Sequence, residues 1–115
     1  KYNSSGVHQW SKRFGGVYFD IANGVAVNPA GSVAMTGYIT GAVDLGTGPV
    51  GGGGSDAFLA RYDADANPLF SAAYGSTYTD NGLAVAFDPS GGVFMTGFFA
   101  GSTSFGSRAA VSSPR

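Results

Sequence analysis

The stretch DPSGGVFMTGF, residues 88–98, decides how the chain is organised, because a closely similar stretch occurs earlier in the sequence. Residues 28–38 read NPAGSVAMTGY, sixty positions earlier. Aligning residues 1–55 with residues 61–115 without a gap gives 15 identical positions. A repeat of several tens of residues is typical of solenoids, propellers and other arrays of one structural unit. The sequence therefore predicts nearly two copies of one unit.

The composition favours short strands joined by turns. The chain has 115 residues, of which 20 are glycine, and its acidic residues are all aspartate. Charged residues make up 11% of the chain, whereas about 25% is usual in soluble domains. Few surfaces of this protein can therefore carry the usual density of charged, solvent-exposed side chains. Glycine, serine, threonine and aromatic residues together predict strands and tight turns, and no stretch has the pattern of a helix.

Charge and hydropathy exclude several classes of partner. The net charge is −1, with six Lys and Arg residues that form no basic stripe, so we expect no nucleic-acid partner. No apolar run approaches the about 20 residues that a membrane-spanning helix needs. The absence of cysteine excludes disulfides and thiolate metal sites. The chain starts at Lys1 without a leader-like pattern, which predicts a processed chain or an excised fragment.

Strand and turn patterns divide each unit into four predicted strands. Residues 1–14 and 56–74 each read as a hairpin, and a second type of hairpin, with Pro and Gly in its turn, covers residues 24–39 and 82–99. Residues 40–55 are rich in glycine and predict the longest loop, with Gly51 to Gly54 as a flexible linker. Proline followed by glycine provides the backbone angles that a tight hairpin turn requires.

Apolar residues occur on both faces of the predicted strands. In residues 93–99, one face receives Val93, Met95 and Phe99, and the other receives Phe94 and Phe98. A sheet with one solvated face would alternate apolar and polar residues. Four-stranded antiparallel sheets that neighbours cover on both faces are the blades of a β-propeller. We therefore predict an all-β chain of propeller blades.

Two segments resemble a known repeat family. SDAFLARYD, residues 55–63, and GLAVAFDPSGGVFMTG, residues 82–97, resemble the bacterial seven-bladed β-propeller repeat found in secreted and surface proteins. The resemblance covers essentially the whole chain and implies a propeller fold and an extracellular or cell-surface location. It implies no particular activity.

By analogy with related repeats, residues 22–74 form one complete blade, flanked by an outer half-blade at residues 1–14 and an inner half-blade at residues 82–106. About two blades cannot close a ring of the usual roughly 4 to 8. Two alternatives remain open: the chain is part of a longer propeller, or copies of it associate head to tail, so that further blades come from the parent chain or from a homo-oligomer.

Loops that connect strands at one end of a blade are the predicted binding region. In an up-and-down sheet the loops at residues 15–21, 40–55 and 75–81 share one end. They carry the aromatic and carboxylate side chains that suit a glycan or a peptide. The candidate ligand-binding residues are Tyr18, Phe19, Asp20, Asp44, Tyr78 and Asp80. The alternative is that these residues pack and fix the loops through side-chain hydrogen bonds.

Three motifs suggest a chemical function by their sequence pattern alone. Gly46 to Gly51 fits G-x-G-x-x-G but no helix follows it, which a dinucleotide site requires. Asp63 to Asn67 begins like a calcium-binding loop but lacks its glycine and glutamate, so we expect a turn. His8 is the only histidine, and nothing in the sequence places a nucleophile beside it. We therefore predict no catalytic residue, metal or cofactor.

The predicted function is a non-enzymatic propeller scaffold or binding module of a secreted or cell-surface bacterial protein. The alternative is a carbohydrate-binding, lectin-like or adhesive propeller assembled from several copies. An enzyme is disfavoured, because one histidine and no glutamate or cysteine leave few groups for acid–base catalysis.

Overall fold

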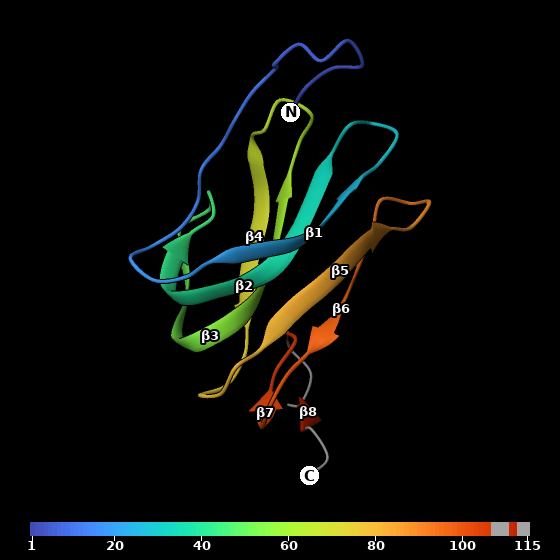
Figure 1. The fold of residues 1–115 in the computed structure, drawn as a ribbon. Helices are drawn as coiled ribbons and strands as arrows, with labels where there is room; N and C mark the ends of the chain where they lie inside the picture. The colour runs from blue at the N-terminus through green and yellow to red at the C-terminus, as the bar shows by residue number, and fades with distance from the viewer. Residues whose placement is uncertain (107–110, 113–115) are drawn as a thin grey trace.

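The computed structural model describes residues 1–106 and 111–112, and these residues form an all-β structure (Figure 1). The first sheet contains β1 (Ile21–Val27), β2 (Val33–Asp44), β3 (Pro49–Tyr62) and β4 (Pro68–Tyr74). The later strands are β5 (Asn81–Phe87), β6 (Val93–Phe98), β7 (Ser102–Thr103) and β8 (Val111–Ser112). The prediction of an all-β chain is confirmed.

The first sheet has four antiparallel strands in the order β1-β2-β3-β4, so every connection is a hairpin. The strands β5 and β6 form a separate antiparallel hairpin, and β7 pairs with β8. A meander of this kind leaves two open edges, along β1 and β4. In the β5–β6 hairpin, one edge of β6 is unpaired. The corresponding edge of β2 in the first sheet pairs with β3.

The sequence repeat is also a repeat of strand register. Val25 is opposite Met35 in the first hairpin, and Val85 is opposite Met95 in the second. Each pairing shifts register at the same place, between residues 22 and 24 and between residues 82 and 84. Such a shift marks a β-bulge, which twists the strand locally. The two hairpins therefore agree in pairing and in distortion.

Aspartate and asparagine side chains fix the turns. Asp63 Oδ1 accepts hydrogen bonds from the backbone N–H of Asp65 and Asn67, both at 2.9 Å. Asp88 Oδ1 accepts them from Ser90 and Gly92, both at 2.8 Å. Such side-chain acceptors stabilise the turn. Residues 63–67, which begin like a calcium loop, thus form a hairpin turn.

The prediction of a long glycine-rich loop at residues 40–55 is wrong. These residues extend β2 and β3 as a curled hairpin, in which Ala42 is opposite Gly51 and Asp44 is opposite Pro49. Gly41 and Gly51 have φ values of 78° and 81°, which only glycine adopts without strain. The glycines therefore allow the hairpin to bulge and bend while it keeps its pairing, and Gly51 to Gly54 are strand residues.

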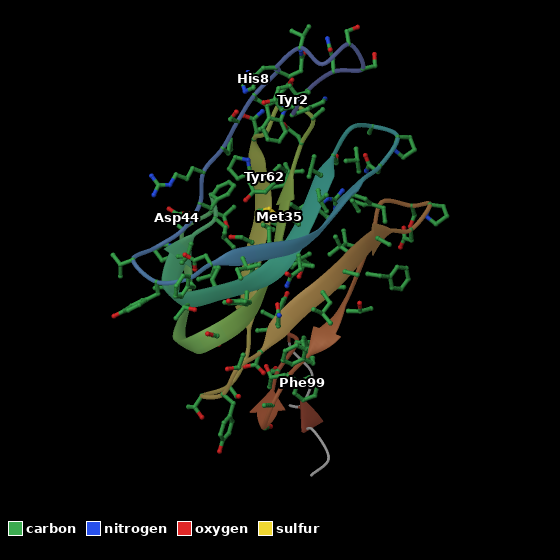
Figure 2. All side chains as sticks on the ribbon, in the orientation of Figure 1. Tyr2, His8, Met35, Asp44, Tyr62 and Phe99 are labelled. Atoms are coloured by element: carbon green, nitrogen blue, oxygen red, sulfur yellow. The ribbon has the colours of Figure 1, made fainter. Side chains whose placement is uncertain are left out.

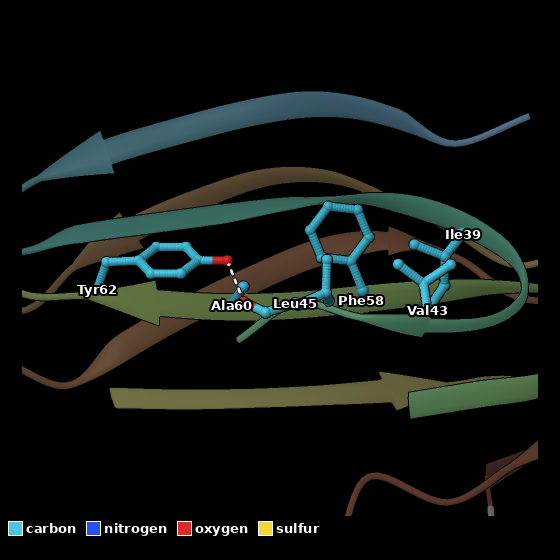
Figure 3. Packing of buried hydrophobic residues seen from close by; sticks show 6 residues of the cluster. All are labelled: Ile39, Val43, Leu45, Phe58, Ala60 and Tyr62. Carbon is cyan, nitrogen blue, oxygen red and sulfur yellow. Dashed lines mark hydrogen bonds between the residues drawn. The ribbon is translucent and has the colours of Figure 1, made fainter. Parts of the chain in front are cut away.

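The curled hairpin supplies two of the six residues in the hydrophobic core cluster. Val43 and Leu45, at its tip, pack with Ile39 and with Phe58, Ala60 and Tyr62 of β3 (Figure 3). Tyr62 donates a hydrogen bond from its hydroxyl group to the carbonyl oxygen of Leu45 at 2.6 Å. This bond ties the tip of the hairpin to the far end of β3, because Tyr62 is the last residue of that strand.

The strands predicted for residues 1–14 do not form. Only an isolated bridge joins Tyr2 and His8, and the chain then runs over the first sheet without pairing (Figure 1). Trp10 donates from Nε1 to the carbonyl oxygen of Ala64 at 3.2 Å, and Phe14 stacks on Tyr62. The corresponding residues 61–74 form strands because β2 lies beside β3 and provides an edge. Residues 1–14 pair with none of the described strands, although the equivalent edge of β6 is open.

The β5–β6 hairpin packs against the first sheet through β5, which lies against β1 and β2 (Figure 1). The Asn23 side chain donates from Nδ2 to Asn81 Oδ1 at 2.8 Å and to the carbonyl oxygen of Gly82 at 2.9 Å. A Cβ atom on Gly82 would lie 1.9 Å from Thr36 Oγ1. The two units therefore approach each other closely through their first strands.

Apolar side chains on the outer surfaces are not covered by the described residues. On β1, Val25 and Val27 are 67% and 62% exposed, and on β6, Phe94 and Phe98 are 65% and 52% exposed. By contrast, Ala34 and Thr36 of β2 are fully buried. Large apolar patches on a soluble surface mark sites of interaction. Each unit thus presents apolar surfaces suited to further packing.

Candidate functional site

The loops at residues 15–20 and 75–80 carry most of the predicted site residues, and aspartates anchor both in the same way. Asp20 Oδ2 accepts a hydrogen bond from the backbone N–H of Gly16 at 2.9 Å, and Asp20 Oδ1 accepts one from the backbone N–H of Thr40 at 3.0 Å. Asp80 accepts from the N–H of Ser76 at 2.8 Å and of Ala100 at 3.0 Å. Every partner is shifted by sixty positions. Asp20 therefore joins its loop to Thr40 within β2, and Asp80 joins its loop to Ala100 just after β6.

This geometry defines what Asp20 and Asp80 do in the structure. Both oxygens of each carboxylate accept backbone hydrogen bonds. Asp80 is fully buried, and Asp20 is partly buried. A carboxylate that is held in this way fixes a loop. The two aspartates show the arrangement expected of the loop-fixing alternative.

A second buried carboxylate, Asp56, lies beside Asp80 where the two units meet. A Cβ atom on Gly75 would lie 2.3 Å from Asp56 Oδ1 and 2.7 Å from Asp80 Oδ2. The backbone N–H of Asp80 donates to the carbonyl oxygen of Ser55 at 2.8 Å. Position 75 must therefore be glycine for β3 to meet the loop of the second unit.

The environment of Asp56 shifts its acidity. Burial raises the pKa of Asp56 above 3.8, and the negative charge of Asp80 raises it further, while hydrogen bonds from Gly53 and Gly52 act in the opposite direction. Burial disfavours the charged form of a carboxyl group, and so does a like charge nearby. Sequence reasoning gave no role to Asp56. Its place at the start of the Ser-Asp-Ala-Phe strand was visible, but its partner lies in the next unit.

The aromatic members of the predicted site are exposed at the tips of these loops. Tyr18 is 67% exposed, Phe19 is 83% exposed and Tyr78 is 58% exposed. Each tyrosine ring lies over a glycine of its own unit: Tyr18 near Gly41 and Tyr78 near Gly101. A Cβ atom on Gly101 would lie 2.9 Å from the Tyr78 ring, whereas one on Gly41 would make an ordinary contact with Tyr18 at 3.7 Å. Exposed rings on anchored loops are suited to stacking against a sugar or an apolar side chain.

Asp44 lies apart from the tyrosines. It occupies the tip of the curled hairpin (Figure 2), where its Oδ1 accepts from the N–H of Gly46 at 2.8 Å and of Gly48 at 3.1 Å. Gly46 in turn lies against Pro68 at the start of β4. The expectation that residues 40–55 share one end with the tyrosine loops fails for Asp44, because the hairpin folds back over the sheet.

His8 lies in the N-terminal turn, far from the core (Figure 2). Its Nε2 is hydrogen-bonded to Ser11 Oγ, and its ring meets Tyr2 edge to face with the centroids 5.6 Å apart. Within the described residues, no three His, Cys, Asp or Glu side chains gather to hold a metal ion. The described residues also contain no helix with the length and apolarity of a transmembrane span.

Two apolar clefts are also related by the repeat. The first has a volume of about 340 Å³ and the second of about 280 Å³. Residues that line the first include Phe14, Ile21, Ala22, Met35, Ile39 and Leu45. The residues sixty positions later line the second cleft. Ala57, from β3, closes one side of the second cleft, so that cleft lies between the two units.

Comparison with known proteins assigns no relative. The sequence matches no protein-family model and no curated protein. The site is therefore interpreted from its geometry alone.

Proposed function

We propose that this chain is a segment of a β-propeller built from sixty-residue units, and that it acts as a non-enzymatic scaffold and binding module. The observation that carries the proposal is the repeated geometry: hairpins with one register, bulges at one position and aspartate anchors with corresponding partners. A unit that recurs with the same contacts can be added many times. Units of this kind form propellers and other arrays.

The packing between units supports a propeller arrangement. The first strands of the two units, β1 and β5, lie against each other. The outer surfaces of the two units expose Val25 on β1 and Phe94 and Phe98 on β6, as expected of sheets that neighbours cover on both sides. The resemblance of residues 55–63 and 82–97 to the bacterial seven-bladed repeat agrees with this proposal. The same resemblance suggests a secreted or cell-surface location and further blades as partners.

The distribution of carboxylates supports a binding role over catalysis. Asp20 and Asp80 hold loop backbone with both oxygens, and Asp44 holds a turn. The groups that a general acid or base would use are thus committed to structure in these loops. The exposed surfaces offer aromatic and apolar contacts instead.

Concatenated units test the propeller proposal. Residues 22–81 make one full unit with its loop, and genes encoding three to nine such units in tandem would be expressed. A propeller predicts a sharp rise in melting temperature and a minimum in aggregation at one unit number, roughly between 4 and 8, where the ring closes. An open solenoid would show stability that increases smoothly with unit number, and that result would refute the proposal.

Glycan recognition is a second candidate, favoured by the exposed rings of Tyr18, Phe19 and Tyr78. A glycan array probed with the labelled chain would detect it. We expect binding that Tyr18→Ala with Tyr78→Ala abolishes and that Leu69→Ala, on β4, leaves unchanged. Absence of binding on the array would reject glycan recognition and leave the scaffold proposal standing.

A further inference from the structure

The loop at residues 15–20 carries three consecutive exposed apolar side chains, Val17, Tyr18 and Phe19, which we call the apolar tip. Val17 is 92% exposed and Phe19 is 83% exposed, the two largest values among the large apolar side chains of the described residues. Figure 1 shows this loop as the outermost bend on the left of the ribbon, just before β1 begins. The Asp20 carboxylate holds the base of the loop by two backbone hydrogen bonds. The apolar tip is therefore an exposed surface on a fixed base.

The corresponding loop of the second unit shows that the fold does not require an apolar tip. Asp80 holds residues 75–80 by hydrogen bonds that correspond to those of Asp20. At the tip of this second loop, however, Thr77 and Thr79 stand in place of the two most exposed apolar residues. Two loops with the same anchors thus differ in the polarity of their tips. The apolar tip is therefore suited to a contact beyond its own loop.

A neighbouring unit would not cover the apolar tip. The loop at residues 75–80 packs against the first unit through its backbone, because the N–H of Asp80 donates to the carbonyl oxygen of Ser55 at 2.8 Å. Residues 77–79 remain exposed in this contact. A further unit packed in the same way against the first loop would leave residues 17–19 exposed too.

Two basic residues precede the apolar tip, and the second unit lacks them as well. Lys12 and Arg13 are exposed, and the corresponding positions hold Ala72 and Ala73. Arg13 lines the same cleft as Asp20, so it lies beside the base of the loop. Among the residues that the structure describes, no carboxylate forms an ion pair with Arg13. The first unit therefore combines positive charge with an apolar tip, and the second unit has neither.

We propose that the apolar tip inserts into the surface of an anionic lipid bilayer, with Lys12 and Arg13 at the level of the phosphate groups. Apolar side chains beside basic ones bind at the boundary between headgroups and acyl chains, and anionic lipids attract each basic residue near the surface. Aromatic side chains such as that of Tyr18 are favoured at this depth. A bilayer is the partner because side chains as exposed as Val17 and Phe19 project from the protein, and a fluid lipid surface receives them without a matching pocket.

This inference goes beyond the scaffold proposal and rests on it only for the way in which a further unit would pack. The exposure of the tip, the threonines of the second loop and the two basic residues are properties of the chain itself.

Flotation of the full chain with large unilamellar vesicles tests the inference. We expect the wild type to float with vesicles of equimolar phosphatidylcholine and phosphatidylglycerol, and less with phosphatidylcholine alone. Val17→Thr with Phe19→Thr gives the first loop the tip of the second. This change should lower the partition coefficient at least about tenfold, because burial of one large apolar side chain is alone worth about that factor. Leu69→Thr is the matched control, since Leu69 is 53% exposed on β4, and it should bind as the wild type does.

The charged part of the surface has its own variant. Lys12→Ala with Arg13→Ala introduces the alanines of the second unit. Binding to the anionic vesicles should fall roughly fivefold for each residue, and binding to phosphatidylcholine alone should stay unchanged. The threonine variant of the tip should instead weaken binding to both kinds of vesicle.

Tryptophan at the tip measures the depth of insertion. The fluorescence of Phe19→Trp should be quenched by phosphatidylcholine that is brominated in its acyl chains. The wild type, in which Trp10 is the single tryptophan, is the control and should be quenched much less.

A wild-type chain that does not float with the anionic vesicles would overturn the inference. A threonine variant that melts normally and binds as tightly as the wild type would also overturn it, because binding would then be adsorption by charge alone. Equal quenching of Phe19→Trp and the wild type would exclude insertion of the tip. These vesicles carry no glycan, so the results are independent of the glycan array and of the concatenated units.

Discussion

Replacing Gly82 by alanine should separate the two units. The added Cβ atom would lie 1.9 Å from Thr36 Oγ1 and 3.2 Å from the carbonyl oxygen of Gly37. Thr36 is fully buried, and its hydroxyl group donates to the carbonyl oxygen of Phe58 at 2.6 Å. The methyl group can be accommodated only if Thr36 turns away and loses this bond, or if β5 moves off β2.

The expected loss has two parts and one offset. Overpacking a close contact costs about 1–3 kcal/mol, and leaving the buried Phe58 carbonyl without a donor costs about 1–3 kcal/mol. Alanine also restricts the unfolded chain, which returns about 0.4–1 kcal/mol. The free energy of unfolding should therefore fall by roughly 2–5 kcal/mol, obtained by combining these contributions.

Urea unfolding followed by circular dichroism and by Trp10 fluorescence would measure this loss. Gly53→Ala is the matched control, because its Cβ atom would meet nothing closer than Ser76 O at 3.6 Å, and we expect a change within about 1 kcal/mol. In a Thr36→Ala background the cost of Gly82→Ala should largely disappear. A Gly82→Ala protein as stable as the wild type, or an equal cost in both backgrounds, would refute the reasoning.

Three further predictions concern buried polar groups. Tyr62→Phe should lower the free energy of unfolding by about 1–3 kcal/mol, because the Leu45 carbonyl loses its donor. Burial raises the pKa of Tyr62 from 10.0 to about 12, so stability should fall between pH 10.0 and about 12 in the wild type. Tyr62→Phe should reduce that fall, and an equal fall in both proteins would assign it to other groups. Asp80→Ala should destabilise more than Asp20→Ala, because only Asp80 is fully buried; equal losses in urea unfolding would contradict the role given to its burial. Acid titration should first stabilise the protein, because the pKa of Asp56 is raised above 3.8 and protonation on approach to 3.8 removes a buried charge. Asp56→Asn should abolish this gain. Hydrogen bonds lower the pKa values of the turn aspartates Asp63 and Asp88 below 3.8. Below pH 3.8 stability should then fall, because these carboxylates become protonated and lose those hydrogen bonds. A melting temperature that falls steadily from pH 7 would contradict the sign assigned to Asp56.

The pKa shifts of the turn carboxylates have local causes, and so they are readable from sequence. A side-chain hydrogen bond from Asn67 is the main reason that the pKa of Asp63 lies below 3.8. Donors two and four residues along the chain define these turns, so sequence spacing alone indicates them. Asp56 differs, because the charge that raises its pKa belongs to the loop of another unit.

The sequence by itself determined the all-β class, the sixty-residue period and the hairpin turns. These features follow from local rules: alternation along strands, proline and glycine in turns, and the identity of residues 28–38 with residues 88–98 at key positions. The repeat of register between the two hairpins then follows, because similar sequences take similar local structures.

Only the tertiary structure decided where the glycine-rich hairpin and the carboxylates go. Residues 40–55 look like a loop in sequence, but pairing between Ala42 and Gly51 and burial of Leu45 turn them into a curled strand pair. Asp44 consequently moves away from the tyrosine loops, and Asp56 meets Asp80 across the units. These outcomes depend on contacts between residues distant in sequence, and burial energy that arises only on packing overrides the local preference of glycine for loops.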